Sequence, residues 1–209
     1  MPHIESAGDD LLSVRLDDVF EIQRVATRLR DAGDWIEVVP GIDSVVVQFD
    51  ALSLAAPQAR DLLQRSIRDL PDEFALPDAV VDIEVSYGGD DGPDLAAVCE
   101  QLGMTEQEFI GMHTGTEQVV DLVGFTPGFV YIGGLGERLA VPRRDTPRQL
   151  VPAGSVAVAD GRTGIYALPS PGGWSLIGRT THALFDAGAD EPMSLEAGMR
   201  VRFIAAGSQ

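Results

Sequence analysis

Three arginines beside two prolines are the side chains of this sequence best suited to hold an anion. Arg143, Arg144 and Arg148 lie in the run PRRDTPR at 142–148. Proline fixes its own φ and stiffens the chain around it, so this loop can aim the arginines. A planar guanidinium donates paired hydrogen bonds that match a carboxylate or a phosphate. The alternative is a solvated loop whose arginines pair with surface carboxylates such as Asp145.

His113 is the candidate proton carrier, because an unperturbed histidine titrates near neutral pH. It lies at the end of a segment with helical periodicity that begins at Thr105, and it precedes the arginine loop. A histidine in the last turn of a helix is also stabilised by the helix dipole without any catalytic role. Both interpretations stay open at this point.

The arginine loop belongs to a longer stretch, 124–180, whose composition differs from the rest of the chain. It holds 11 of the 23 glycines and six of the 13 prolines, which predicts short strands joined by shaped loops. Six arginines against three acidic residues give it a charge of +3, whereas the whole chain carries -18. A locally cationic surface on an acidic protein indicates an anionic ligand or partner.

Two Gly/Pro loops in this stretch can turn backbone N–H groups toward a ligand. They are GFTPGF at 124–129 and SPGGW at 170–174. From the sequence alone, the aromatic residues of both loops are better explained by core packing beside tight turns. Ser155 does not fit the Gly-x-Ser-x-Gly pattern of a serine nucleophile, because alanine occupies both glycine positions, and we interpret it as a hydrogen-bonding residue of a turn.

Composition excludes several classes of protein. The 209 residues are 44% hydrophobic and 23% charged, as in an ordinary globular chain. The net charge of -18 disfavours a nucleic-acid binder, which needs a dominant basic face. The sequence contains no lysine, which excludes a Walker A loop and a Schiff-base mechanism.

The sequence also predicts a cytoplasmic protein without a membrane association. No run approaches the roughly 18 apolar residues of a membrane span, and the start MPHIESAGDD lacks the basic and apolar regions of a signal peptide. The single cysteine, Cys99, has no partner for an internal disulfide, which fits a reducing compartment. Three scattered histidines and one cysteine do not form a zinc pattern, so we predict no metal site.

The N-terminal half is predicted to form a ferredoxin-like α+β domain over 8–87. Asp18 and Glu21 have the spacing of a helix-capping box. The expected elements are a strand at 11–16, a helix at 19–31, a hairpin of 35–39 with 45–49, a helix from Pro57 to the residue before Pro71, and a strand at 80–85. This β-α-β-β-α-β order is the split βαβ pattern.

A Gly/Pro break at 88–93 is the predicted domain boundary, and a mostly-β domain is expected over 94–205. Asp94 is the expected cap of a first helix, and Thr105 with Glu108 forms the capping box of a second. The expected strands are 119–123, 155–159, 164–168, 175–177, 182–185 and 200–204. Many short strands with turns between them indicate a barrel or a sandwich.

Several long motifs in this half resemble one known family. They are GFTPGF (124–129), PRRDTPR (142–148), VPAGSV (151–156), TGIY (163–166) and SPGGWSLIGRT (170–180). From about Tyr87 to Phe203 the sequence is similar to the B subunit of bacterial 5-oxoprolinase. That family is also known as allophanate hydrolase subunit 1, and it includes the sporulation-kinase inhibitor Kip.

The resemblance implies a cyclophilin-like barrel and membership of an ATP-dependent amidohydrolase that converts 5-oxoproline to glutamate. It implies ATP as co-substrate, with a divalent cation, and two partners: a larger homologous C subunit and a third, A subunit. His113, Arg143 and Arg148 would be catalytic, and a small anionic substrate or the nucleotide would contact further residues. Those implied binding residues are Phe125, Pro127, Gly128, Gly154, Ser155, Tyr166, Gly172, Gly173 and Arg179.

Two alternatives remain within the same family. The Kip branch implies a module that binds and inhibits a sensor histidine kinase, and the second family name implies allophanate hydrolysis. The sequence departs from the family pattern at Gln118, where an aromatic is common, and at Met199, where a Gly-Asp pair usually precedes the last strand. The first departure bears on pocket shape and therefore on the substrate.

Overall fold

The computed structural model describes residues 3–68 and 80–207 of the chain. Contacts divide the chain into two compact units, Met1–Leu76 and Pro77–Gln209.

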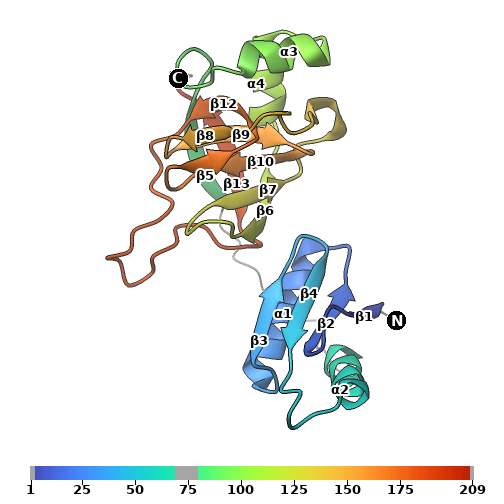
Figure 1. Ribbon diagram of the computed structural model, residues 1–209. Helices are drawn as coiled ribbons and strands as arrows, with labels where there is room; N and C mark the ends of the chain where they lie inside the picture. The colour runs from blue at the N-terminus through green and yellow to red at the C-terminus, as the bar shows by residue number, and fades with distance from the viewer. Residues whose placement is uncertain (1–2, 69–79, 208–209) are drawn as a thin grey trace. The chain divides into compact units, whose positions relative to one another are not determined.

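The first unit is a four-stranded antiparallel sheet with two helices (Figure 1). Its sheet order is β1-β2-β4-β3, and its elements are β1 (Ile4–Ser6), β2 (Leu11–Arg15), α1 (Val19–Ala32), β3 (Glu37–Pro40), β4 (Ser44–Gln48) and α2 (Ala56–Arg68). Helix α1 begins where the Asp18 carboxylate accepts a hydrogen bond from the Glu21 amide at 2.9 Å, and it ends at Gly33, whose φ of 72° is left-handed. The predicted helix at 19–31 and the predicted hairpin are confirmed.

The prediction of a ferredoxin-like domain is wrong in its last strand. The segment predicted as that strand, 80–85, lies in β5 (Val80–Tyr87), which pairs with strands of the second unit. In the first unit, the place beside β2 is taken by β1, with Ile4 opposite Val14. An alternating apolar strand fits either sheet, so periodicity could not choose between them.

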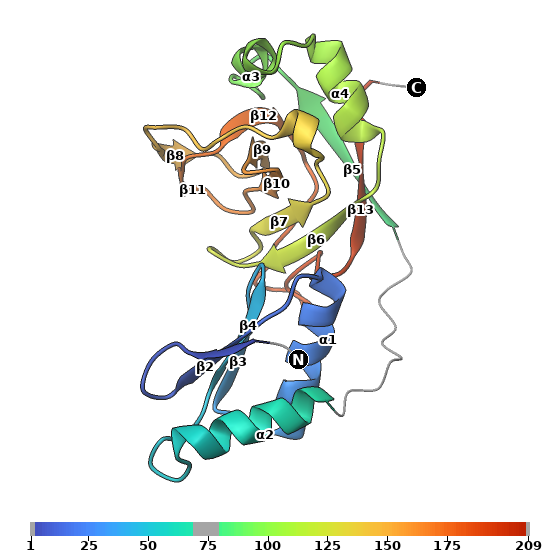
Figure 2. The same cartoon turned by 90° about the vertical axis from the view of Figure 1, so that its right-hand side faces the viewer.

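The second unit is a closed seven-stranded barrel with two helices at one end (Figure 2). Around the barrel the order is β10-β7-β6-β13-β5-β12-β9, and β13 pairs in parallel with β5. Its elements are β5, α3 (Leu95–Leu102), α4 (Glu106–Thr114), β6 (Gln118–Val123), β7 (Val130–Gly133), the 3-10 turn η1 (Glu137–Leu139), β8 (Arg148–Val151), β9 (Ser155–Ala159), β10 (Arg162–Ile165), β11 (Ser170–Gly172), β12 (Ser175–Arg179) and β13 (Arg200–Ala205).

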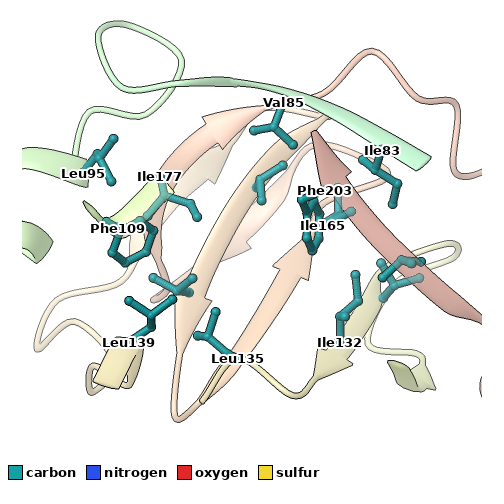
Figure 3. Packing of buried hydrophobic residues seen from close by; sticks show 14 of the residues in the cluster. Ile83, Val85, Leu95, Phe109, Ile132, Leu135, Leu139, Ile165, Ile177 and Phe203 are labelled. Atoms are coloured by element: carbon teal, nitrogen blue, oxygen red, sulfur yellow. The ribbon is translucent and has the colours of Figure 1, made fainter. Parts of the chain in front are cut away.

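The barrel interior is filled by aliphatic and aromatic side chains from strands and helices. Figure 3 shows Ile83 and Val85 of β5, Phe203 of β13 and Ile165 of β10 directed into this space. Phe109 of α4 is fully buried in the same cluster, which joins the helices to the barrel. Burial of this apolar surface is the main stabilising contribution to the unit.

A second apolar cluster covers part of the outer face of the barrel. On β9, Val156 and Val158 belong to the interior cluster, whereas Ala157 and Ala159 belong to the outer one. All five residues of β9 are buried, as expected of a strand covered on both faces. The remaining members of the outer cluster are Phe129, Val151, Tyr166, Trp174 and Leu176.

Most predicted elements of the second unit are present, and the barrel is confirmed. The predicted strand at 182–185 is wrong, since the structure has a single bridge there, between Phe185 and Met193. Three short strands, β7, β8 and β11, were not predicted. Within 3–68 and 80–207, no helix is long and apolar enough to cross a membrane.

Candidate functional site

A pocket of about 290 Å³ opens on the outer face of the barrel, over the second apolar cluster. Its walls come from the loop before β7, from β7, from the arginine loop and from the β11–β12 connection. The lining residues are Phe125, Phe129, Tyr131, Arg143, Pro147, Tyr166, Pro171, Gly172, Gly173 and Trp174. Concave, largely apolar sites with a few polar groups are where small ligands bind.

Aromatic rings form most of the wall, and Phe129 lies at their centre. Its ring makes edge-on contacts with Phe125, Tyr131, Tyr166 and Trp174 at centroid distances of 4.8–6.1 Å. Edge-to-face contacts of this kind are favourable beyond the area that they bury. The wall is therefore a packed, preformed surface.

Two glycines allow these rings to lie directly against the strands. At Gly164 an added Cβ would come within 2.9 Å of both the Phe129 and the Trp174 rings. At Gly172 it would overlap the Tyr166 hydroxyl. A side chain at either position would therefore displace the wall of the pocket.

Phe125 is the strained member of the wall. Its φ is 73°, in the left-handed region that L-residues rarely adopt, and the residue is 63% exposed. A strained backbone that also exposes a phenyl ring is typical of positions under functional constraint. The sequence showed the GFTPGF loop but not that Phe125, in addition to Gly128, has a left-handed backbone conformation.

Arg143 brings the positive charge to this pocket. Its Nε donates to Asp160 at 2.8 Å, and its Cζ lies 5.9 Å from the centroid of the Trp174 ring. The ion pair and the cation–π contact hold the guanidinium at the pocket. Arg143 also lines a neighbouring, more polar pocket of about 360 Å³ together with Asp94, Arg144 and Asp145.

Arg148 and Arg144 have a different role from Arg143. Both donate to Oδ1 of Asp94, at 2.8 and 2.9 Å, while Oδ2 accepts from the Leu176 amide at 2.7 Å. Asp94 occupies the expected N-cap position of α3, but its side chain makes no capping hydrogen bond. Its carboxylate instead ties the arginine loop to strand β12 and to the start of α3.

His113 lies inside the barrel and away from the pocket. It is fully buried, with Nδ1 2.6 Å from the Tyr87 hydroxyl and Nε2 3.0 Å from the Thr163 hydroxyl. Burial lowers the pKa of His113 to about 3 and raises the pKa of Tyr87. Thr163 faces the interior while its neighbour Gly164 faces the pocket wall, so the β-sheet separates His113 from the pocket.

The other residues that were predicted to bind a ligand fall into two groups, those that line the pocket and those that do not. Phe125, Tyr166, Gly172 and Gly173 line the pocket with Arg143. The predicted residues that do not line it are Pro127, Gly128, Gly154, Ser155 and Arg179, together with Arg148 and His113.

The residues outside the pocket have packing or pairing roles. Gly128, with φ of 74°, packs so closely that a Cβ there would lie 2.6 Å from Cβ of Phe185. Gly154, with φ of 78°, turns the chain beside the Thr180 carbonyl. Ser155 is buried, and Arg179 lies 3.4 Å from the Asp91 carboxylate.

The lining residues that the sequence did not predict are Tyr131, Pro147, Pro171, Trp174 and Phe129. Phe129 and Trp174 were interpreted as core, which is half correct because both belong to the outer cluster and also line the pocket. No prediction was made for Tyr131. The usable signal was Gly164, because a glycine inside a strand can mark a close approach by other groups, but it needs the strand pairing to be interpreted.

The comparisons with known proteins identify the class of this fold. Residues 2–195 match the family described as carboxyltransferase domain, subdomain C and D. The solved protein TTHA0988 superimposes with a TM-score of 0.79 at 33% identity, over 95% of this chain and 41% of that one. This chain therefore spans about two-fifths of the length of that protein.

Two curated relatives narrow the class further. The chain is 43% identical over 184 residues to the 5-oxoprolinase B subunit of Escherichia coli O157:H7, covering 88% of this chain and 84% of that protein. It is 34% identical over 220 residues to the 5-oxoprolinase B subunit of Bacillus subtilis (strain 168), covering 96% and 91%. The chain belongs to the family of 5-oxoprolinase B subunits.

Proposed function

We propose that this chain is one subunit of an ATP-dependent amidohydrolase of the 5-oxoprolinase type, which opens 5-oxoproline to glutamate. The supporting observation is the identity of 34–43% to proteins named as the B subunit of 5-oxoprolinase, over most of their lengths. The word subunit in those names supports a shared assembly, for which the family resemblance supplies a larger homologous C subunit and a third, A subunit.

Coupling to ATP is chemically reasonable for this reaction. A five-membered lactam is little strained, and its amide is a poor electrophile. Transfer of a phosphoryl group to the carbonyl oxygen would give water a better centre to attack. Cleavage of the C–N bond, with a proton passing to the nitrogen, would then leave an acyl phosphate, which a second water would hydrolyse to the carboxylate and inorganic phosphate, so that water finally accepts the phosphoryl group. ATP, with a divalent cation, would supply that group.

The described residues of this chain do not fit the nucleotide and its cation. No group of three or more His, Cys, Asp or Glu among 3–68 and 80–207 could hold a metal ion. The sequence has no lysine for the phosphates. Arg144 and Arg148 are already paired with Asp94. We therefore propose that the nucleotide binds to another chain of the assembly.

The contribution proposed for this chain is binding and orientation. Arg143 can hold an anionic group, the aromatic wall can exclude water from one side of a substrate, and Gly172 and Gly173 bring the backbone close to it. His113 is too deeply enclosed to exchange a proton with a ligand in this pocket. Proton transfer would then come from another chain of the assembly.

Reconstitution tests the proposal. The chain is coexpressed with the candidate A and C subunits, and glutamate release from 5-oxoproline is measured with and without ATP. We expect activity only with all three chains and ATP, and negligible ATP hydrolysis by this chain alone. Turnover of allophanate instead would support the second family name. Failure of every combination, alongside tight binding to a sensor histidine kinase, would support the inhibitor alternative.

A further inference from the structure

We propose that the pocket on the outer face of the barrel binds a small cyclic monocarboxylate, with Arg143 holding the carboxylate and the aromatic wall contacting the ring. The naming of 5-oxoproline as the member of this class rests on the proposed function. The class itself rests on the charge, size and wall of the pocket.

Charge limits the ligand to a single anionic group. Among the described residues that line the pocket, Arg143 alone carries a full charge. Burial raises the pKa of both Tyr131 and Tyr166 from its ordinary value, so their phenols stay neutral at physiological pH. A nucleoside triphosphate carries several negative charges and requires several donors and a cation. One arginine matches one carboxylate.

The geometry of Arg143 leaves donors for that carboxylate. Asp160 accepts the hydrogen bond from Nε, and within the described part of the chain the two Nη groups make no hydrogen bond. The Asp160 pair and the Trp174 ring restrict the motion of the guanidinium, so little entropy is lost when a ligand binds.

Size and wall chemistry favour a compact ring. The volume of about 290 Å³ lies at the lower end of the range of roughly 300–1,000 Å³ for small-molecule pockets. Edge-to-face packing fixes the aromatic rings without a ligand, which gives a preformed apolar surface. A saturated five-membered ring offers apolar edges to such a wall and places its carboxylate at the rim.

Gly173 provides a way to change the pocket without disturbing the fold. An added Cβ there would meet Pro147 at 3.7 Å and the Arg144 carbonyl at 3.9 Å, both ordinary contact distances. Gly173 and Pro147 both line the pocket, so the methyl group of Gly173→Ala would occupy ligand space. Gly172→Ala is unsuitable, because its methyl group would overlap the Tyr166 hydroxyl.

The experiment uses the full chain with Trp35→Phe, so that Trp174 is the remaining tryptophan and its fluorescence reports the pocket. The probes are 5-oxoproline, cyclopentanecarboxylate, 2-pyrrolidinone and glutamate, with calorimetry as a second measurement. We expect saturable binding of the two cyclic carboxylates. The uncharged lactam and the open-chain glutamate should bind at least about tenfold more weakly.

Arg143→Lys keeps the charge but removes the planar guanidinium that donates paired hydrogen bonds, so we expect about a tenfold loss of affinity for the cyclic carboxylates. Arg202→Lys is the matched control, because Arg202 is also an exposed barrel arginine paired with an aspartate, Asp82. It should bind like the parent. Gly173→Ala should weaken binding severalfold while the melting temperature changes by less than about 2 °C.

The inference would be overturned if the Arg143→Lys and Arg202→Lys variants bound 5-oxoproline with equal affinity. It would also be overturned if 5-oxoproline and 2-pyrrolidinone, which lacks the carboxylate, bound equally well. Absence of saturable binding by either cyclic carboxylate would also overturn it, since the pocket is complete within this chain. The proposed function is judged separately by reconstituted turnover. If the pocket binds the cyclic carboxylates but no combination of the three chains turns over 5-oxoproline, the binding site stands and the proposed 5-oxoprolinase function fails. If the assembly turns over 5-oxoproline but this pocket binds neither carboxylate, the proposed function stands and the binding site fails.

Discussion

Arg143 and Arg148 are five positions apart in the arginine loop, and the environment of each guanidinium decides its role. The Arg143 side chain is 62% exposed at the pocket, whereas the Arg148 side chain is 25% exposed and bound to Asp94. A change at Arg143 should therefore act on ligand binding. A change at Arg148 should act first on the stability of the barrel.

Asp94→Asn tests the pairing that holds this loop. The neutral amide would leave the Arg144 and Arg148 guanidiniums without a compensating charge in a partly buried site, so we expect a loss of about 3 kcal/mol in the free energy of unfolding. Urea unfolding followed by Trp174 fluorescence measures it.

The control for this change is Asp82→Asn. Asp82 binds Arg202 through two hydrogen bonds, but this pair is exposed, so we expect a loss below about 1 kcal/mol. Equal effects of the two substitutions would show that Asp94 is an ordinary surface partner.

His113 makes the stability of the barrel dependent on pH. Its pKa is lowered from 6.5 to about 3 by burial, so the unfolded chain binds a proton at pH values where the folded chain does not. This contribution is fully present above pH 6.5 and is lost as the pH falls toward 3. We expect the free energy of unfolding to drop by about 2 kcal/mol between pH 7 and pH 5 from this group.

His113→Gln should remove that slope, because glutamine can keep hydrogen bonds to Tyr87 and Thr163 without titrating. The measurement is denaturant unfolding at pH 7 and pH 5, compared with a His182→Gln variant that should retain the slope of the parent. A slope that persists in the His113 variant would assign the pH dependence to other groups.

The roles that follow from residue type could be predicted from the sequence, whereas the partner of each residue could not. The prediction that the arginine loop binds an anion and the prediction of a tight turn in the GFTPGF loop both follow from local chemistry. The partner of Arg144 lies 50 positions away and that of His113, Thr163, also lies 50 positions away. Such pairings depend on the register of the barrel, which single-sequence periodicity does not contain.

At the scale of elements, β5 is the informative case. Its sequence VVDIEVSY has the alternation of a strand, but alternation does not specify the sheet. The break at 88–93 is a tight turn fixed to the barrel, with Gly88 N bonded to the Ile177 carbonyl and Asp94 N to that of Leu176. Glycine and proline there indicate a turn within the unit, whereas the division by contacts falls between Leu76 and Pro77.

Two truncated chains separate these alternatives. A fragment beginning at Pro77 keeps β5 and should fold, with dispersed amide NMR signals and a cooperative thermal transition. A fragment beginning at Asp94 lacks the strand between β13 and β12, so the barrel cannot close and we expect aggregation or a non-cooperative transition. Cooperative folding of the shorter fragment would restore the boundary predicted from the sequence.

At the scale of the whole molecule, the two units have separate hydrophobic clusters, and each holds one of the two tryptophans. Trp35 belongs to the first cluster and Trp174 to the outer cluster of the barrel. Separate cores need not unfold together.

We expect different denaturation midpoints for the Trp35→Phe and Trp174→Phe variants when each is followed by its remaining tryptophan. Unfolding monitored by circular dichroism should then span both transitions. Coincident midpoints by all probes would show that the units unfold as one cooperative body.

The parallel pairing of β13 with β5 has a consequence for synthesis of the protein. Six residue pairs join these strands, from Arg200 with Val80 to Ala205 with Val85, yet almost the whole barrel sequence lies between them. While the ribosome is still translating toward β13, β5 and β6 have no neighbour on the side that β13 will occupy, and unpaired strand edges invite association with other chains. The first unit, made entirely of earlier residues, can fold during that interval. The barrel is therefore the part of the nascent chain for which slow translation is hazardous and for which protection by a chaperone would matter most.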